Sequence, residues 1–196
     1  MQKKIVVHMY LKNGKAVTGF DGKELLEDGD VMSIAQHYSN NGADELLIFD
    51  LSDDDADHEQ SLNLIRQISR VIDIPMSGGG HIKNLEDVKK LLYAGCQQVF
   101  LNYAKAANIE LTEEVSKRFG KEKIAICTDS FAQLQANKAR VNEYTSRVIL
   151  LCDEVDVRTT ARLVEVPVLP VSTRADRHGL LKLLMLDNIC GVCGDT

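Results

Sequence analysis

One stretch decides the fold of this chain: Ile74-Pro75-Met76-Ser77-Gly78-Gly79-Gly80-His81-Ile82, together with the run to Asn102. Residues 74–77 predict a short buried strand, after which three glycines leave the backbone free of Cβ atoms. Asn84 is a favoured helix N-cap, and apolar residues then recur at helical spacing until Gly95. Residues 98–101 predict a second strand. Strand, glycine turn, helix and strand form one βαβ unit, which requires a parallel sheet.

The glycine turn follows the carboxyl end of its strand. Backbone N–H groups that no side chain shields can bind an anion such as phosphate at this place. Glycines also serve simply to turn the chain, and the triplet alone does not separate the two interpretations. We therefore take Gly78, Gly79 and Gly80 as candidate phosphate ligands. Asp50, at the end of the preceding predicted strand, is a further candidate site residue.

The composition indicates a globular protein and argues against two classes of partner. With 196 residues and 44% hydrophobic content, the chain can bury a full core as one domain. Its formal net charge of -6 and its pI of about 5.4 argue against binding to nucleic acid or to an anionic membrane. No apolar run reaches the length of a membrane span, and the start of the chain lacks a signal-peptide cleavage site. We expect a cytoplasmic protein.

The cysteines predict reduced thiols rather than a disulfide framework. Their number is odd, and most lie in apolar segments: Cys96, Cys127, Cys152, Cys190 and Cys193. Cys190 and Cys193 have C-x-x-C spacing, but no second pair exists, and in an extended strand their sulfurs point to opposite faces. The acidic run at residues 52–59 lacks the ligand spacing of a calcium loop, so we interpret it as charge at a helix N-terminus. We expect no metal and no cofactor.

Eight predicted strands alternate with helices along the chain. They cover residues 5–11, 45–51, 74–77, 98–101, 123–127, 147–152, 166–171 and 188–193. This pattern predicts a (β/α)8 barrel that is shortened in its C-terminal half. The alternative is an open doubly wound sheet, in which the glycine turn normally follows the first strand. We also expect a long polar loop at residues 14–29, a helix capped by Thr112, and either a short helix or a hairpin between Ser130 and Ser146.

A family resemblance is carried by five stretches in order. They are Leu11-Lys12-Asn13-Gly14-Lys15-Ala16-Val17-Thr18-Gly19, Gly42-Ala43-Asp44-Glu45-Leu46-Leu47-Ile48-Phe49-Asp50, Ile74-Pro75-Met76-Ser77-Gly78-Gly79-Gly80, Ala94-Gly95-Cys96-Gln97-Gln98-Val99-Phe100-Leu101-Asn102 and Phe119-Gly120. Together they resemble the phosphosugar-handling (β/α)8 barrels of histidine biosynthesis. The resemblance is closest to the cyclase subunit of imidazole glycerol phosphate synthase, and more distant to its sister, phosphoribosylformimino-aminoimidazole carboxamide ribotide isomerase. It covers about two-thirds of the chain, from the first strand to Asp129.

The resemblance implies two catalytic carboxylates, one after strand 1 and one after strand 5, that act as general acid and base. Asp129 matches the strand-5 carboxylate. Tyr10 stands where the strand-1 carboxylate belongs, and a tyrosine with an ordinary pKa of about 10 is a poor base at neutral pH. Thr18 stands where the cyclase has a lysine. His8 shares the face of Tyr10 and is a third catalytic candidate, unless it only fills a layer of the barrel.

The resemblance also implies a ligand with a phosphate at each end. The first phosphate site corresponds to four residues: Gly78, Gly79, Gly80 and Asn102. Tyr103 replaces the hydroxyl residue that the family has next to this asparagine. The second phosphate site requires a glycine pair, where this chain has Ser172-Thr173-Arg174, and Asp195 would oppose the charge of Arg174. We keep the first site as a candidate and expect the second to be lost.

These replacements favour a degenerate cyclase-type barrel linked to histidine biosynthesis, without cyclase activity, that serves as a structural, regulatory or phosphate-binding domain. The alternative is an active cyclase (a lyase) or isomerase that uses Asp129 with His8 or Tyr10. The expected ligand is a phosphorylated sugar or a nucleotide-like small molecule. We interpret the chain as one domain, or as the N-terminal part of a longer fusion. Because no helix is predicted after the last strand, we expect a homo-oligomer or contact with a following domain or a partner subunit.

Overall fold

The computed structural model describes residues 1–26, 30–153 and 155–194. It divides into two compact units. The N-terminal unit is Val6–Val99, and the C-terminal unit combines Met1–Ile5 with Phe100–Thr196. Each unit consists of strands that alternate with helices, and each is described here by itself.

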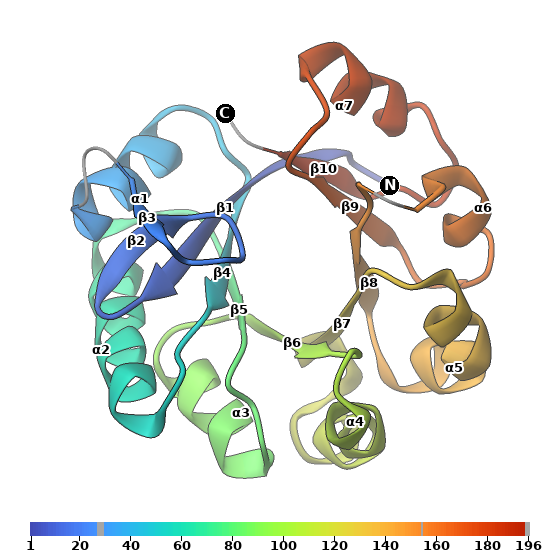
Figure 1. The fold of residues 1–196 in the computed structure, drawn as a ribbon. Coiled ribbons are helices and arrows are strands. Elements are labelled where there is room, and N and C mark those ends of the chain that lie inside the picture. The colour runs from blue at the N-terminus through green and yellow to red at the C-terminus, as the bar shows by residue number, and fades with distance from the viewer. Residues whose placement is uncertain (27–29, 154, 195–196) are drawn as a thin grey trace. The chain divides into compact units, whose positions relative to one another are not determined.

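The N-terminal unit is built on a sheet with the strand order β5-β4-β1-β2-β3 (Figure 1). Its elements are β1 (Lys4–Lys12, whose first two residues belong to the other unit), β2 (Lys15–Thr18), β3 (Glu24–Leu25), α1 (Val31–Asn40), β4 (Glu45–Asp50), α2 (Asp55–Val71), β5 (Met76–Gly79) and α3 (Leu85–Tyr93). β1, β4 and β5 are parallel, and Leu47 of β4 lies opposite His8 of β1 and Ser77 of β5. All six residues of β4 are buried, as expected for a central parallel strand.

Side chains cap the helices α1 and α3 of this unit, and the cap at Asn84 is the one that the sequence predicts. The Asp30 side chain accepts hydrogen bonds from the backbone N–H groups of Met32 and Ser33 and so caps α1. Asn84 and Asp87 form a capping box at the start of α3. In α2, the side chains that recur at helical spacing are fully buried: Leu62, Ile65 and Ile68.

The prediction of one long loop at residues 14–29 is wrong, because residues 15–18 and 24–25 form the strands β2 and β3. β2 and β3 pair antiparallel with β1 and with each other, so that Val17 lies opposite both Tyr10 and Leu25. Asn13 and Gly14 both have positive φ, 51° and 69°, which is the backbone of a two-residue hairpin turn. Burial of Ala16 and Val17 holds this hairpin on the unit. Residues 27–29 of the expected loop lie outside the described residues.

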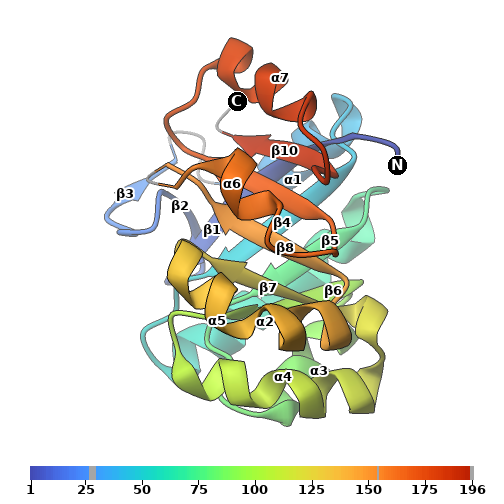
Figure 2. The same cartoon turned by 90° about the vertical axis from the view of Figure 1, so that its right-hand side faces the viewer.

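The C-terminal unit has the strand order β10-β9-β8-β7-β6. Its elements are β6 (Gln98–Asn102, which begins in the other unit), α4 (Ala106–Phe119), a 3-10 helix η1 (Lys121–Lys123), β7 (Ile124–Thr128), α5 (Phe131–Tyr144), β8 (Arg147–Leu151), α6 (Val157–Ala161), β9 (Val168–Ser172), α7 (Arg177–Leu184) and β10 (Gly191–Gly194). β7 to β10 pair as parallel strands. Figure 2 shows α4 and α5 side by side in this unit.

Two expectations for the C-terminal unit are settled by the structure. The segment between Ser130 and Ser146, for which the sequence allows a helix or a hairpin, is the 14-residue helix α5, which Ser130 caps. Thr112 does not cap a helix, and that prediction is wrong: it lies inside α4 and is fully buried. Its hydroxyl donates to the Asn108 carbonyl one turn earlier, at 2.9 Å, so the group that favours a cap is satisfied within the helix.

Eight strands that alternate with helices define this chain as a (β/α)8 barrel, as the sequence predicted. The predicted shortening of the C-terminal half is also confirmed, because two of its helices are short. Helix α6 has five residues and α7 has eight, whereas α2 of the N-terminal unit has 17. Among the described residues, no helix is long and apolar enough to cross a membrane.

Candidate functional site

The glycine triplet lies at the end of β5, but the strand begins and ends two residues later than predicted, at Met76 and Gly79. Gly78 and Gly79 belong to β5, opposite Ile48 and Phe49 of β4, and only Gly80 turns the chain, with φ +107°. A Cβ atom on Gly80 would lie 2.0 Å from the Asp50 carbonyl oxygen. One on Gly78 would lie 2.8 Å from Sγ of Cys96. Both glycines are therefore required for close packing, whether or not the turn binds an anion.

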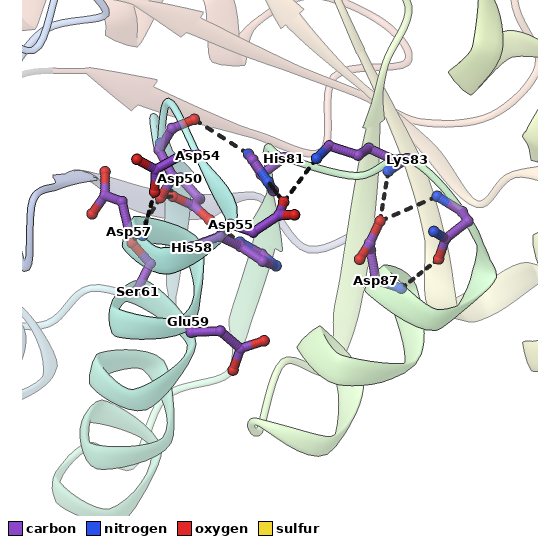
Figure 3. Close-up of polar contacts among 12 residues, drawn as sticks. Asp50, Asp54, Asp55, Asp57, His58, Glu59, Ser61, His81, Lys83 and Asp87 are labelled. Atoms are coloured by element: carbon purple, nitrogen blue, oxygen red, sulfur yellow. Dashed lines mark hydrogen bonds and ion pairs between the residues drawn. The ribbon is translucent and has the colours of Figure 1, made fainter.

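Asp50, at the carboxyl end of β4, is buried and uses both carboxylate oxygens within the N-terminal unit (Figure 3). One oxygen accepts hydrogen bonds from the backbone N–H of Ser52, at 3.0 Å, and from the Ser52 hydroxyl. The other lies 2.5 Å from Nδ1 of His58, whose side chain is only 3% exposed. These bonds tie the end of β4 to the first turns of α2. Asp50 is thus a structural anchor of the turn region.

His81 links the glycine turn to the start of α2. Its Nε2 lies 2.7 Å from Oδ1 of Asp55, and its Nδ1 lies 3.3 Å from the Ser52 carbonyl oxygen. Its ring stacks on that of His58, with centroids 4.6 Å apart. Lys83 also bonds Oδ1 of Asp55, at 2.8 Å. The hydrogen bond from His81, and then that from Lys83, lowers the pKa of Asp55 to about 2.

The acidic run at residues 52–59 lies at the N-terminus of α2, which confirms its interpretation as charge at a helix N-terminus. The Asp54 side chain caps α2 by accepting a hydrogen bond from the Asp57 backbone N–H, at 2.8 Å. Other members of the run form ion pairs with nearby lysines: Asp53 with Lys12, Asp55 with Lys83, and Glu59 with Lys90. Within the part of the chain that the structure describes, no group of three or more His, Cys, Asp or Glu side chains is arranged to hold a metal.

Tyr10, the residue in place of the expected strand-1 carboxylate, lies in an aromatic cluster of the N-terminal unit. Its ring stacks on Phe49, with centroids 5.3 Å apart, and meets Phe20 edge-on at 4.8 Å. His8 lies 4.9 Å from the same ring. Tyr10 is 3% exposed and His8 is 8% exposed. The structure therefore brings these two candidates together, but within a largely apolar environment.

The remaining candidates of the first phosphate site and of catalysis belong to the C-terminal unit. Asp129 is exposed directly after β7. Asn102 ends β6, and its side-chain oxygen accepts a hydrogen bond from the Ala104 backbone N–H at 2.9 Å. Tyr103 is fully buried, and its hydroxyl bonds that of Thr112 at 2.8 Å. Burial raises the pKa of Tyr103. Tyr103 is therefore a core residue, and its hydroxyl bonds within the core of the C-terminal unit.

The segment Ser172-Thr173-Arg174, where we expect the second phosphate site to be lost, donates hydrogen bonds to a carboxylate of the same chain. Asp153, after β8, accepts hydrogen bonds from the hydroxyl of Ser172 at 2.6 Å and from the backbone N–H of Thr173 at 3.1 Å. The Thr173 hydroxyl adds a third bond, at 2.5 Å. These donors would suit an external anion equally well. The expected opposition between Arg174 and Asp195 cannot be followed, because Asp195 lies outside the described residues.

The five cysteines are free thiols, in agreement with the sequence. Burial raises the pKa of Cys96 and of Cys127 to about 12, and that of Cys152 to about 11. Thiolate is the reactive form of cysteine, so these three side chains are poor nucleophiles and poor metal ligands at neutral pH.

One hollow of about 360 Å³ lies beside the turns that lead into β9 and β10. It is lined by six residues of the C-terminal unit: Arg158, Arg162, Lys182, Met185, Leu186 and Asp187. Enzymes with (β/α)8 barrels place their sites at the carboxyl ends of the strands. This hollow lies at the amino ends of β9 and β10, so we do not assign it to the candidate site.

The fold and the turn at the end of β5 define a (β/α)8 barrel with a candidate anion site at the carboxyl end of a strand. The chain belongs to the family of histidine biosynthesis proteins, whose model matches residues 4–187. This confirms the resemblance in the sequence.

Curated relatives carry a more specific name, "Imidazole glycerol phosphate synthase subunit HisF". The protein of Flavobacterium psychrophilum is 33% identical over 130 residues, which cover 66% of this chain and 52% of the relative. That of Haemophilus influenzae is 32% identical over 162 residues, or 82% of this chain and 60% of the relative. That of Helicobacter hepaticus is 34% identical over 132 residues, which cover 66% of this chain and 51% of the relative. The chain thus spans about half the length of most curated relatives it matches.

Proposed function

We propose that this chain is a cyclase-type barrel of histidine biosynthesis that binds one phosphorylated sugar or nucleotide-like ligand and does not carry out cyclase turnover. The observation that carries the proposal is the position of Tyr10. Where the resemblance implies a proton-transferring carboxylate, the chain has a buried phenol packed against Phe49 and Phe20. General acid–base catalysis contributes about 10²–10⁴-fold to a rate, so the loss of one partner removes most of the expected turnover.

We expect the ligand to need only one phosphate, because the two candidate anion sites differ. The turn after β5 keeps the glycine that lets its backbone pass close to Asp50. By contrast, the donors of Ser172 and Thr173 are used by the Asp153 carboxylate. A second phosphate would have to displace this carboxylate. We therefore expect a ligand with one phosphate and one with two phosphates to bind with similar affinity.

The alternative function is an active cyclase or isomerase, in line with the name of the curated relatives. The observation that favours it is Asp129, which the chain retains exposed at the carboxyl end of β7. His8 or Tyr10 would then have to serve as its proton-transferring partner.

The deciding experiment is an ammonia-dependent cyclase assay and an isomerase assay on purified protein. We expect no turnover above background from the parent, and only a slight gain from Tyr10→Asp, because the second phosphate site stays occupied. Turnover in the parent that Asp129→Asn abolishes would overturn the proposal. Asp73→Asn, which changes an exposed aspartate after α2, is the matched control and leaves any such activity unchanged.

A further inference from the structure

The hollow of about 360 Å³ beside the turns into β9 and β10 carries an excess of positive charge. Its charged lining consists of Arg158, Arg162 and Lys182, against the single carboxylate of Asp187. The chain as a whole has a formal net charge of -6, so these three cations gather against the trend of the composition. Among the residues that the structure describes, none of the three forms an ion pair. Arg158 is attracted by the Asp156 carboxylate that caps α6, but only at longer range.

The rest of the lining is apolar and comes from the two residues after α7. Met185 and Leu186 complete the hollow, and Met185 is 85% exposed. A methionine side chain is unbranched and polarisable, so it adapts to ligands of different shape. Sites for small molecules usually measure about 300–1,000 Å³ and combine apolar walls with a few polar groups. The hollow has this size and this mixture.

Asn188 holds the two walls of the hollow together. Its side-chain Nδ2 lies 2.9 to 3.0 Å from three carbonyl oxygens in and after α6, those of Ala161, Val164 and Val166. Because Asn188 directly follows Asp187 and Ala161 directly precedes Arg162, these contacts tie one side of the lining to the other. Lys3 adds a hydrogen bond to the Leu186 carbonyl oxygen, at 3.2 Å. The backbone of the hollow is thus formed before a ligand binds, which reduces the cost of ordering it.

A second hollow of the C-terminal unit, of about 610 Å³, provides a comparison. Its two cations, Lys138 and Arg162, are balanced by two carboxylates, Glu143 and Glu165. The excess of positive charge is therefore a property of the first hollow and not of this surface in general.

We propose that the hollow of Arg158, Arg162 and Lys182 binds a phosphomonoester with an apolar body. Such a phosphate carries a charge of about −1.5 to −2 at pH 7, which matches three cations against one carboxylate. A guanidinium group binds two phosphate oxygens at once, and an ammonium group adds a point charge. The apolar body lies against Met185 and Leu186. A carboxylate ligand would leave one positive charge uncompensated.

This site is independent of the proposed function. It belongs to the C-terminal unit, whereas the glycine turn after β5 belongs to the N-terminal unit. Its ligand can therefore bind whether or not the glycine turn takes a phosphate.

The test is an NMR titration of the full chain with phenyl phosphate, followed through the Met185 methyl group and the Asn188 side-chain amide. We expect both signals to shift together, with an affinity in the millimolar range, because charge pairs open to solvent are weak. Inorganic phosphate lacks the apolar body, and benzyl alcohol lacks the charge. We expect each of them to bind at least about threefold more weakly than phenyl phosphate.

A pair of double variants separates the hollow from general surface charge. Arg158→Gln combined with Lys182→Gln should weaken the binding of phenyl phosphate about fivefold, the joint effect of two exposed charge pairs. Arg118→Gln combined with Lys138→Gln removes the same charge from exposed positions of the same unit that do not line this hollow. This matched control should keep the affinity of the parent.

Three results would overturn the inference. Equal affinity for phenyl phosphate and benzyl alcohol would show an apolar hollow without preference for an anion. Equal weakening by the two double variants would show attraction by the overall charge alone. The third result is the absence of any shift both in the parent and in Leu181→Gln. Leu181 is 47% exposed and does not line the hollow, so this variant excludes masking by a second copy at α7. Shifts confined to the amides of Gly79 and Gly80 would support the proposed function and refute this site.

Discussion

Gly80 shows at the scale of one residue why the turn after β5 has a fixed shape. Its φ is +107°, and a Cβ atom at this position would lie only 2.0 Å from the Asp50 carbonyl oxygen. Position 80 therefore has no room for a side chain. The same carbonyl belongs to the aspartate that binds Ser52 and His58. The turn, the end of β4 and the start of α2 therefore depend on one another.

We predict that Gly80→Ala destabilises the protein more than Gly42→Ala. Both glycines have positive φ, so alanine at either site costs about 1–2 kcal/mol of backbone strain. A Cβ at position 42 meets nothing within 4 Å, whereas one at position 80 collides with backbone. Urea unfolding of the two variants measures the difference. Equal losses would show that the chain beside Gly80 moves away freely, against the fixed turn described here.

The candidate residues show how far the sequence predicts a site. The positions of Asp50 and Gly80 at strand ends predict both as site residues, and the structure places both at the turn. The partnership of His58 and His81 is not predictable in this way, because a pattern along the chain does not reveal which side chains from separate segments stack. The nearest signals are the position of His81 directly after the glycines and the separation of eight residues between Asp50 and His58. The apolar surroundings of Tyr10 depend in the same way on Phe20 and Phe49.

At the scale of elements, Asp153 connects the ends of β8 and β9. Burial alone would raise the pKa of Asp153, but the hydrogen bonds from Ser172 and Thr173 outweigh it and lower the pKa below its ordinary value. A lowered pKa in the folded state means that the ionised carboxylate stabilises the fold above the unfolded pKa. This contribution is lost as the pH falls through the folded pKa.

We therefore predict that Asp153→Asn lowers the free energy of unfolding at pH 7 by about 0.5–1 kcal/mol, a modest value because the site is partly screened by solvent. The difference from the parent should be smaller at about pH 3 than at pH 7, because the stabilisation by the ionised carboxylate is lost as the pH falls through the folded pKa of Asp153. Urea unfolding at both pH values provides the measurement. Asp73→Asn, at an exposed aspartate, should match the parent at both. A deficit that persists unchanged in acid would point to packing instead of charge.

The elements themselves are largely predictable, and the errors have local causes. All eight strands are present, because buried parallel strands give continuous apolar runs in the sequence. β5 extends beyond its predicted end, since Gly78 and Gly79 have no side chain to indicate a strand. The hairpin of β2 and β3 escapes prediction because its strands have only four and two residues. The prediction for Thr112 fails because a threonine can satisfy its hydroxyl inside a helix as well as at its start.

At the scale of the whole molecule, the exposed apolar side chains of α7 are the feature that bears on association. The helix contacts β10 through Leu180, whose Cδ1 would lie 2.6 Å from a Cβ on Gly194. None of its residues is fully buried. Leu181 is 47% exposed, and Met185, directly after the helix, is 85% exposed. Apolar side chains gathered on one exposed face commonly mark an interface.

We predict that the chain self-associates through α7, most simply as a two-fold dimer. In such a dimer each copy covers the apolar face of the other, at a gain of about 25 cal/mol for each Å² of apolar surface buried. Light scattering at micromolar concentration should give twice the mass of the chain, and Leu181→Glu should return it to that of a monomer, because a charge would then be buried in the interface. Tyr93→Glu, at a 78% exposed aromatic residue of α3, is the matched control and should remain dimeric. A parent chain that is a uniform monomer, or a dimer that survives Leu181→Glu combined with Met185→Glu, would refute the role of α7.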